Sequence, residues 1–332
     1  MQGFRRSGVV GIITAFTTFA IVGCSTTAKN ASTPSDTPSD TVNTGSSSGA
    51  SPATGGGNGA LIGVIIPSTD NSLLEAERDA AVKELEKNGY KTVTGASNQD
   101  PTQERKLVQS YIALGVKGLI WDVTSSTSSA QTVQLAKDAN IPSVLMDQPI
   151  TKDGIAIKQL YSDNKQCGEL AAQEFVKLTN GSGKYALLRG IESQDNETQR
   201  NQGILSVVSQ SQGLQLVGQQ SAKWDETQAN QVTSTFLQKA PDLVGVIAEN
   251  DTMALGAAAA ITAAGKQAVV VGIDGSSDAE DAIKKGGPLK ATAAQPLVQG
   301  ATLAADTLMQ YLTDHQLPSP ERQQLPCTLF TG

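Results

Sequence analysis

Residues Val244–Gly256, VGVIAENDTMALG, decide the fold class of this chain. The apolar, β-branched run Val244–Ala248 predicts a buried parallel strand, and it stops abruptly at three polar residues, Glu249–Asp251. An alanine-rich run, Thr252–Ala264, then predicts a helix. In open α/β sheets, ligands bind beyond the carboxyl ends of the parallel strands. The stretch therefore predicts an α/β fold with polar side chains at a binding site.

The same alternation of short strands and helices runs through the chain from Leu61 onward. Ser72–Glu75 predicts a capping box at one helix start, and Asp100-Pro101 predicts an N-cap followed by proline at another. The expected strands are residues 62–66, 91–94, 118–121, 143–146, 185–188, 214–217, 244–248, 269–271 and 290–294. They fall into two similar halves, so we expect two doubly wound, parallel-sheet lobes with a crevice between them.

The N-terminus carries the signals of export. Arg5-Arg6 precede an apolar run, Val9–Val22, which is too short for a comfortable membrane span and predicts a secretory signal peptide over residues 1–23. Ile21–Cys24 resembles the lipobox of bacterial lipoproteins, which implies that Cys24 takes a lipid and becomes the new N-terminus. An uncleaved anchor helix or a buried cysteine is the alternative. We expect an extracytoplasmic, lipid-anchored protein in the periplasm or at the cell surface.

Composition separates a tether from the globular part. Residues 24–59 begin with the lipobox cysteine, and Ser25–Gly59 are mostly Ser, Thr, Pro, Gly, Ala and Asp, which offer little to bury and predict a flexible tether. The remainder is long enough for two domains. The net charge of −7, without any basic stripe, argues against a nucleic-acid partner, because phosphate binding needs clustered Lys and Arg.

The sequence offers little to an enzyme. Its one histidine, His315, lies in a polar, proline-flanked stretch near the end. A G-x-S-x-G match at Gly45–Gly49 and a glycine-rich match at residues 55–60 both precede the first expected strand, so neither has the strand-to-helix context that its chemistry needs. No metal-ligand spacing stands out. We expect no catalytic residues, no metal and no cofactor.

Two cysteines remain besides Cys24. Cys167 and Cys327 are far apart in sequence, in a chain that we expect in a disulfide-permissive compartment. They form a disulfide if the fold brings them together; otherwise they are two buried free thiols.

Polar side chains follow nearly every expected strand. They include Asp70-Asn71, Trp121-Asp122, Asp147-Gln148, Arg189–Gln194, Trp224-Asp225, Asn250-Asp251, Asp274 and Gln295. Carboxylates accept hydrogen bonds from hydroxyls, amides both donate and accept, and aromatic faces complement the C–H face of a sugar ring. This inventory predicts an uncharged, polyhydroxylated ligand held between the two lobes.

Six segments resemble those of a known family: IPSTDNSLLEAERDAA, ANIPSVLMDQ, YSDN, AENDTMALGA, VVVGIDG and ATAAQP. They are similar, in this order, to segments of ribose-type, type I periplasmic sugar-binding proteins of ABC importers. LacI-type repressors share part of the pattern, but they carry an N-terminal DNA-binding motif where this chain has a signal and a tether. The resemblance implies a sugar ligand, an ABC permease as partner, and a monomer.

The resemblance also implies which residues contact the sugar. Positions that match the family's ligand contacts are Asn71, Asp147, Trp224, Asn250, Asp274 and Gln295. Other positions depart from the family pattern. Gln148 replaces an arginine, and Leu73 and Leu74 stand where relatives place stacking aromatics. Thr198 stands at a second arginine position, although Arg200 follows two residues later. These departures put ribose itself in doubt. We expect Gln148 in the site and offer Trp121 as a replacement stacking face.

The family resemblance further implies hinge closure about three chain crossings. We place the crossings near Ser162–Asp163, Gln295 and Gln324–Cys327. The N-terminal lobe is then residues 60–162 with 296–322, and the C-terminal lobe is residues 163–295 with 323–332. A Cys167–Cys327 bridge would lie on the hinge side, away from the ligand. The alternative function is a receptor for a non-carbohydrate or signalling molecule, such as a nucleoside, coupled to a membrane sensor.

Overall fold

The computed structural model describes residues 56–332. The expected signal peptide, the lipidation site Cys24 and all but the last residues of the expected tether lie outside this described part. None of the helices within it is long and apolar enough to cross a membrane.

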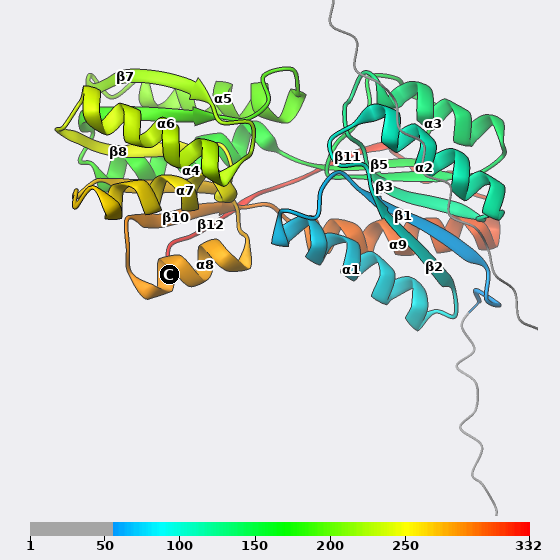
Figure 1. The fold of residues 1–332 in the computed structure, drawn as a ribbon. Helices are drawn as coiled ribbons and strands as arrows, with labels where there is room; N and C mark the ends of the chain where they lie inside the picture. Colours follow the sequence, from blue (N-terminus) through cyan, green and yellow to red (C-terminus); the bar gives the residue numbers. More distant parts are fainter. Residues whose placement is uncertain (1–55) are drawn as a thin grey trace, which may run out of the picture. The chain divides into compact units, whose positions relative to one another are not determined.

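The described residues form two six-stranded sheets (Figure 1). The first has the order β11-β5-β4-β3-β1-β2, and all its pairings are parallel. Its strands are β1 (Leu61–Ile66), β2 (Lys91–Ala96), β3 (Gly118–Asp122), β4 (Ser143–Met146), β5 (Lys158–Ser162) and β11 (Arg322–Leu325). The order reverses direction at β1, which makes this sheet doubly wound, as predicted.

The second sheet has the order β12-β10-β9-β8-β6-β7. Its strands are β6 (Ser182–Arg189), β7 (Gly213–Ser221), β8 (Leu243–Ala248), β9 (Val269–Asp274), β10 (Leu289–Ala294) and β12 (Thr328–Phe330). All pair in parallel except β12, which runs antiparallel to β10. The expected fold class, two doubly wound α/β lobes, is therefore confirmed.

Helices cover both faces of each sheet (Figure 1). Buried side chains of α1 (Ser72–Lys87) and α9 (Leu297–Asp314) pack on one face of the first sheet, and those of α2 (Pro101–Leu114) and α3 (Ser129–Asp138) pack on the other. In the second sheet, α4 (Asn164–Leu178) and α5 (Asp195–Val208) cover one face. The other face is covered by α6 (Glu226–Lys239), α7 (Asp251–Ala263) and α8 (Ser277–Lys285).

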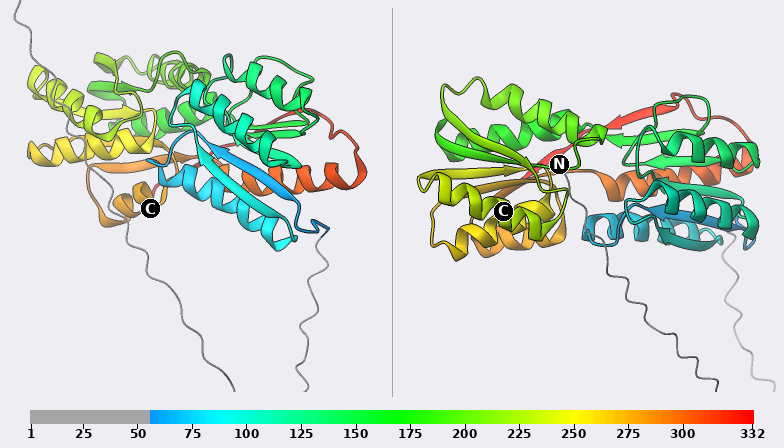
Figure 2. Two further views of the ribbon diagram at one scale, coloured as in Figure 1. Left: turned by 45° about the vertical axis from the view of Figure 1, so that its right-hand side comes forward. Right: turned by 45° about the horizontal axis from the view of Figure 1, so that its top comes forward.

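The chain passes between the sheets three times (Figure 2). It leaves the first sheet after β5, returns after β10 so that α9 packs on the first sheet, and leaves again between β11 and β12. The last passage follows Leu325, whereas the sequence analysis placed residues 323–332 in the second lobe. The polar sequence of β11, RQQL, gave no strand signal, because its strand conformation depends on pairing with β5.

Cys167 and Cys327 form a disulfide across 160 residues, with their Cα atoms 5.4 Å apart. Cys167 lies in the first turn of α4, directly after the first passage, and Cys327 lies within the third. The bond therefore joins the start of α4, directly after the first passage, to the third passage.

Candidate functional site

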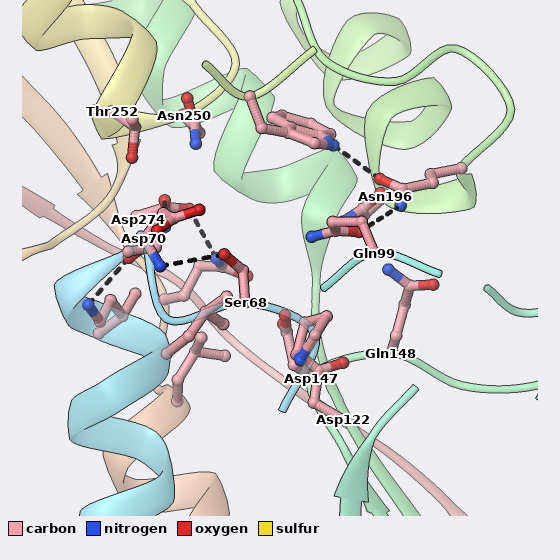
Figure 3. A pocket seen from close by; sticks show the side chains of 18 of the residues that line it. Ser68, Asp70, Gln99, Asp122, Asp147, Gln148, Asn196, Asn250, Thr252 and Asp274 are labelled. Carbon is pink, nitrogen blue, oxygen red and sulfur yellow. Dashed lines mark hydrogen bonds between the residues drawn. The ribbon is translucent and has the colours of Figure 1, made fainter. Parts of the chain in front are cut away.

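A cavity of about 370 Å³ lies at the carboxyl ends of both sheets (Figure 3). The residues that line it lie at or beyond the ends of β1 to β4 of the first sheet and of β6 to β10 of the second. Most of the strand ends that carry polar residues in the sequence therefore contribute to this one cavity. The lining includes Asp70, Asn71, Leu73, Leu74, Gln99, Asp122, Asp147, Gln148, Gln194, Asn196, Arg200, Trp224, Asn250, Thr252, Asp274 and Gln295.

Seven of the residues predicted to contact ligand line this cavity: Asn71, Asp147, Gln148, Trp224, Asn250, Asp274 and Gln295. Leu73 and Leu74 line it as well. These apolar side chains stand where stacking aromatics were expected in relatives. The site therefore has less aromatic surface on its first-sheet side than the family pattern implies.

Trp121 is the exception, and its assignment as a stacking face is wrong. Its side chain is fully buried in the core formed with α2 and α3, and it does not line the cavity. The reason is the alternation of a strand: Trp121 and Asp122 point to opposite faces of β3, so only one of them reaches the cavity. That residue is Asp122.

Asn71 and Asn250 each begin a helix while lining the cavity. The Asn71 Oδ1 atom accepts from the backbone N–H of Leu73 at 2.9 Å, and Asn250 Oδ1 accepts from that of Met253 at 2.9 Å. Each asparagine thus has a helix-capping role in addition to its place in the cavity lining. The two roles are compatible, because the cap uses only the amide oxygen; the amide nitrogen of Asn71 donates to Asp274 instead.

Asp274 is the centre of a buried polar network. Its carboxylate accepts from Arg200 at 3.1 Å, from Gln295 Nε2 at 2.8 Å and from Asn71 Nδ2 at 3.2 Å. Burial raises the pKa of Asp274, while Arg200 and these donors oppose the rise. Its φ of 140° is a backbone conformation that L side chains rarely adopt, and it occurs here at the last residue of β9.

Arg200 was not assigned to the site by the sequence analysis, which noted it only as lying near a lost arginine at Thr198. Thr198 is exposed on α5, whereas Arg200 is buried. Its guanidinium also donates to Asn164 Oδ1 at 2.8 Å and to the Glu249 carbonyl oxygen at 2.6 Å. Helical periodicity in the sequence could have identified Arg200 as buried. It lies on the same face of α5 as Glu197, Asn201 and Ile204, and that face is buried.

Trp224 presents its ring to the cavity. The indole N–H donates to Gln194 Oε1 at 2.7 Å, and the Arg200 guanidinium carbon lies 5.6 Å from the ring centroid. The ring also lies against Gly190, where an added Cβ would come within 2.0 Å of it. Gly190 is therefore required for this ring position. The contacts fix the ring in place, as a stacking surface requires.

Three acidic side chains gather at the end of the cavity nearest the first sheet. Asp122 and Asp147 lie close together there (Figure 3), and Glu77 of α1 is buried behind them. Burial raises the pKa of Asp147 to about 6, with Arg200 lowering it and Asp274 raising it. Burial and the charge of Asp147 raise the pKa values of Glu77 and Asp122 well above the ordinary range. Among the three, Asp147 therefore most readily carries the negative charge, whereas burial and the Asp147 charge disfavour the anionic forms of Glu77 and Asp122.

Comparison with known proteins identifies the family. Residues 62–316 match the family model described as periplasmic binding protein domain. The D-apiose import binding protein of Paraburkholderia graminis is 40% identical over 281 residues, which cover 84% of this chain and 90% of that protein. The ribose import binding protein of Escherichia coli is 33% identical over 235 residues, covering 70% and 78% respectively.

Solved structures agree with these relatives. An ABC transporter solute binding protein from Bacillus halodurans, with bound myo-inositol, has a TM-score of 0.75 and 26% identity, and the match covers 85% of this chain and 96% of that one. Proteins of this family work outside the cytoplasm. The expected resemblance to ribose-type proteins is confirmed: the chain belongs to the periplasmic binding protein family and has its type I fold.

Proposed function

We propose that this protein captures a small, neutral sugar of the pentose class, with D-apiose as the first candidate, and delivers it to an ABC importer. The observation that carries the proposal is the cavity lining, which combines carboxylates and amides with one fixed indole ring. Such groups pair with adjacent hydroxyls and with the C–H face of a sugar ring. The relative named for D-apiose import is the source of the specific candidate.

The charges of the lining favour a neutral ligand. Its acidic residues are Asp70, Asp122, Asp147, Asp225, Glu226 and Asp274, and its basic residues are Arg200 and Lys223. Arg200 is already paired with Asp274 at 3.1 Å. A sugar acid or sugar phosphate would therefore meet an excess of acidic groups, with Lys223 as the one basic residue among the described lining residues that is not already paired with an acid.

A thermal-shift screen of the purified protein tests this function. The screen compares pentoses, hexoses, polyols, nucleosides and amino acids. Each neutral sugar is matched with its acid or phosphate derivative. A ligand at about one hundred times its Kd adds roughly 2.7 kcal/mol of stability, which gives a clear shift. We expect D-apiose or a related neutral pentose to respond and the acids to be silent. A response to amino acids with silence across all carbohydrates would contradict the proposal and favour a non-carbohydrate receptor.

Delivery requires a membrane partner and a place near it. We propose that Cys24 is lipidated after removal of residues 1–23, that residues 24–59 tether the monomeric globular part to the membrane, and that the permease binds the ligand-loaded form. Lipidation is supported by the lipobox-like sequence Ile21–Cys24. Replacing Cys24 with Ala is expected to move the protein from the detergent phase to the aqueous phase in phase partition. Equal partition of both forms would argue against the anchor.

A further inference from the structure

A second, much smaller chamber lies behind the ligand cavity. Its volume is about 10 Å³, which is close to the space that one water molecule needs. Asp147 and Leu297 line both spaces, so they form the wall between them. The other residues around this hinge-side chamber are Glu77, Leu160, Tyr161, Ser162, Pro296, Gly300 and Leu325.

The chamber touches all three passages between the sheets. Ser162 ends β5 at the first passage, Pro296 lies in the second, and Leu325 ends β11 at the third. α9 also begins here, and Pro296 at its N-cap provides no side-chain hydrogen bond. The first backbone N–H groups of a helix need partners from outside the helix. The chamber therefore places a few polar groups, among mostly apolar residues, at the junction of the moving parts expected for this family.

Buried polar atoms at this chamber lack partners among the described residues. Glu77 is completely buried, and neither of its carboxyl oxygens is hydrogen-bonded; the same is true of Ser162 Oγ. A buried polar group without a partner costs free energy, so such groups are normally satisfied by protein or ordered water. Glu77, Ser162 and Asp147 offer one water the two to four partners that it requires.

The charges around Glu77 favour its protonated, neutral form over the carboxylate. Asp147 faces it from the end of β4, and Asp122 lies near both at the end of β3. Tyr161 and Ser162 face the chamber from β5, and the first turn of α9 adds the partial positive charge of a helix N-terminus. Arg200 acts on Asp147 from the cavity side, and Asp274 opposes it. This arrangement stabilises one anion, and Asp147, which lies nearer the arginine, is that anion.

We propose that Glu77 is a neutral hydrogen-bond donor that, through one water in the hinge-side chamber, positions the Asp147 carboxylate for the ligand and links it to Ser162 at the first passage. Glu77 itself does not touch the ligand. The proposal rests on the proposed sugar capture, because Asp147 acts there as a ligand contact. It assigns a positioning role to a residue that nothing in the ligand cavity alone would identify.

The experiment compares Glu77→Leu, Glu77→Gln and, as a control on the same helix, the exposed Glu86→Gln. Kd for the sugar found in the screen is measured by calorimetry from pH 5 to pH 9, together with the unfolding midpoint without ligand. Leucine fills the site without a buried carboxyl, so Glu77→Leu is expected to keep or raise the midpoint. Its affinity is expected to fall about tenfold, the size of one hydrogen bond to a charged group.

The pH profile separates positioning from packing. In the wild type, Glu77 loses its proton as the pH rises through its raised pKa, so affinity is expected to fall toward alkaline pH. Glu77→Gln keeps a neutral donor and is expected to bind like the wild type at pH 7 without that alkaline fall. Wild-type affinity in Glu77→Leu, or an unchanged alkaline fall in Glu77→Gln, overturns the proposal.

A ligand-free measurement keeps this test independent of the proposed function. Because the pKa of Glu77 in the folded protein is raised, its stabilising protonation is fully present below about pH 4.5 and is lost as the pH rises. The wild-type midpoint is therefore expected to fall with pH relative to that of Glu77→Gln. If the unfolding midpoints of the wild type and Glu77→Gln change with pH in parallel, the proposal that Glu77 is neutral is overturned. Failure of any sugar to bind the wild type would instead defeat the sugar assignment.

Discussion

The side-chain amide of Asn71 donates to Asp274 Oδ2 at 3.2 Å and thereby joins a helix start on the first sheet to a strand end of the second. The same side chain accepts from the Leu73 N–H at 2.9 Å, which fixes the orientation of the amide. The cap therefore directs Asn71 Nδ2 toward Asp274. A residue whose local role is to begin α1 also organises the binding network.

Replacing Asn71 separates the two roles. Serine keeps an N-cap acceptor but does not reach Asp274, so Asn71→Ser is expected to change the free energy of unfolding by less than about 0.5 kcal/mol. The affinity for sugar is expected to fall about tenfold, because a hydrogen bond to a charged group is lost. Asn71→Ala is the control that also removes the cap, at a further cost of about 1 kcal/mol in stability. Calorimetry showing wild-type affinity in Asn71→Ser would contradict the dual role.

The two tryptophans are expected to respond in opposite ways. Trp224→Ala removes the ring from the cavity, so affinity should fall about tenfold or more, with a modest change in stability. Trp121→Ala opens the core of the first sheet, so the free energy of unfolding should fall by about 3–5 kcal/mol. The affinity of its folded fraction should stay close to that of the wild type. Trp224→Phe, which keeps a ring, is the matched control. Denaturant titration and calorimetry of the three variants check this, and a loss of stability without loss of affinity in Trp224→Ala would refute it.

Glu249 gives the protein an alkaline limit to its stability. Its carboxylate accepts from the Gly190 N–H at 2.8 Å, while burial raises its pKa from 4.5 to about 8. Folding therefore favours the protonated acid, whose contribution is full below about pH 4.5 and is lost as the pH rises through 8. Between these two pH values, the free energy of unfolding of the wild type should fall by up to about 1.4 kcal/mol per pH unit relative to that of Glu249→Gln. Urea unfolding of both proteins at pH 6 and pH 8 measures this difference. If the free energy of unfolding changes equally with pH in the two proteins, Glu249 titrates normally.

The disulfide is expected to affect stability without affecting affinity. Neither Cys167 nor Cys327 is among the residues that line the ligand cavity. The bond closes a long loop of 160 residues, so replacing both cysteines with serine should lower the free energy of unfolding by roughly 2–5 kcal/mol. Sugar affinity should stay within twofold. A large loss of affinity would indicate that the bond also holds the passages in their binding geometry.

The sequence predicts best where an element carries its own apolar run. Val244–Ala248 and Val269–Val271 are unmistakable because they are buried on both faces of a parallel sheet. β5, with the sequence KQLYS, is buried but not apolar. Its polar groups are satisfied by distant residues: Lys158 donates to the Pro320 carbonyl oxygen at 2.8 Å and Gln159 to Glu321 at 2.8 Å. Such partners cannot be foreseen from the local sequence.

The site shows the same division. Asp147 and Asp274 were predictable because one directly follows β4 and the other ends β9, where the fold class dictates their positions. Arg200 and Glu77 lie on helices, so their arrival at the cavity or the chamber depends on how α5 and α1 rotate against their sheets. Trp121 was assigned to the wrong face of its strand. Neighbouring strand residues point to opposite faces, and Asp122 is the one that faces the cavity.

The first sheet is completed by the end of the chain. α9 and β11 are its last contributions, and more than one hundred residues of the second sheet and its helices are synthesised before them. A nascent polypeptide that has produced β1 to β5 still lacks the helix that covers one face and the strand that closes one edge. Cutting the gene at residue 162 would therefore not yield an independently stable N-terminal fragment. Each sheet is completed only by this last segment, β11 for the first and β12 for the second, so neither half reaches its final packing until the end of the chain has been synthesised.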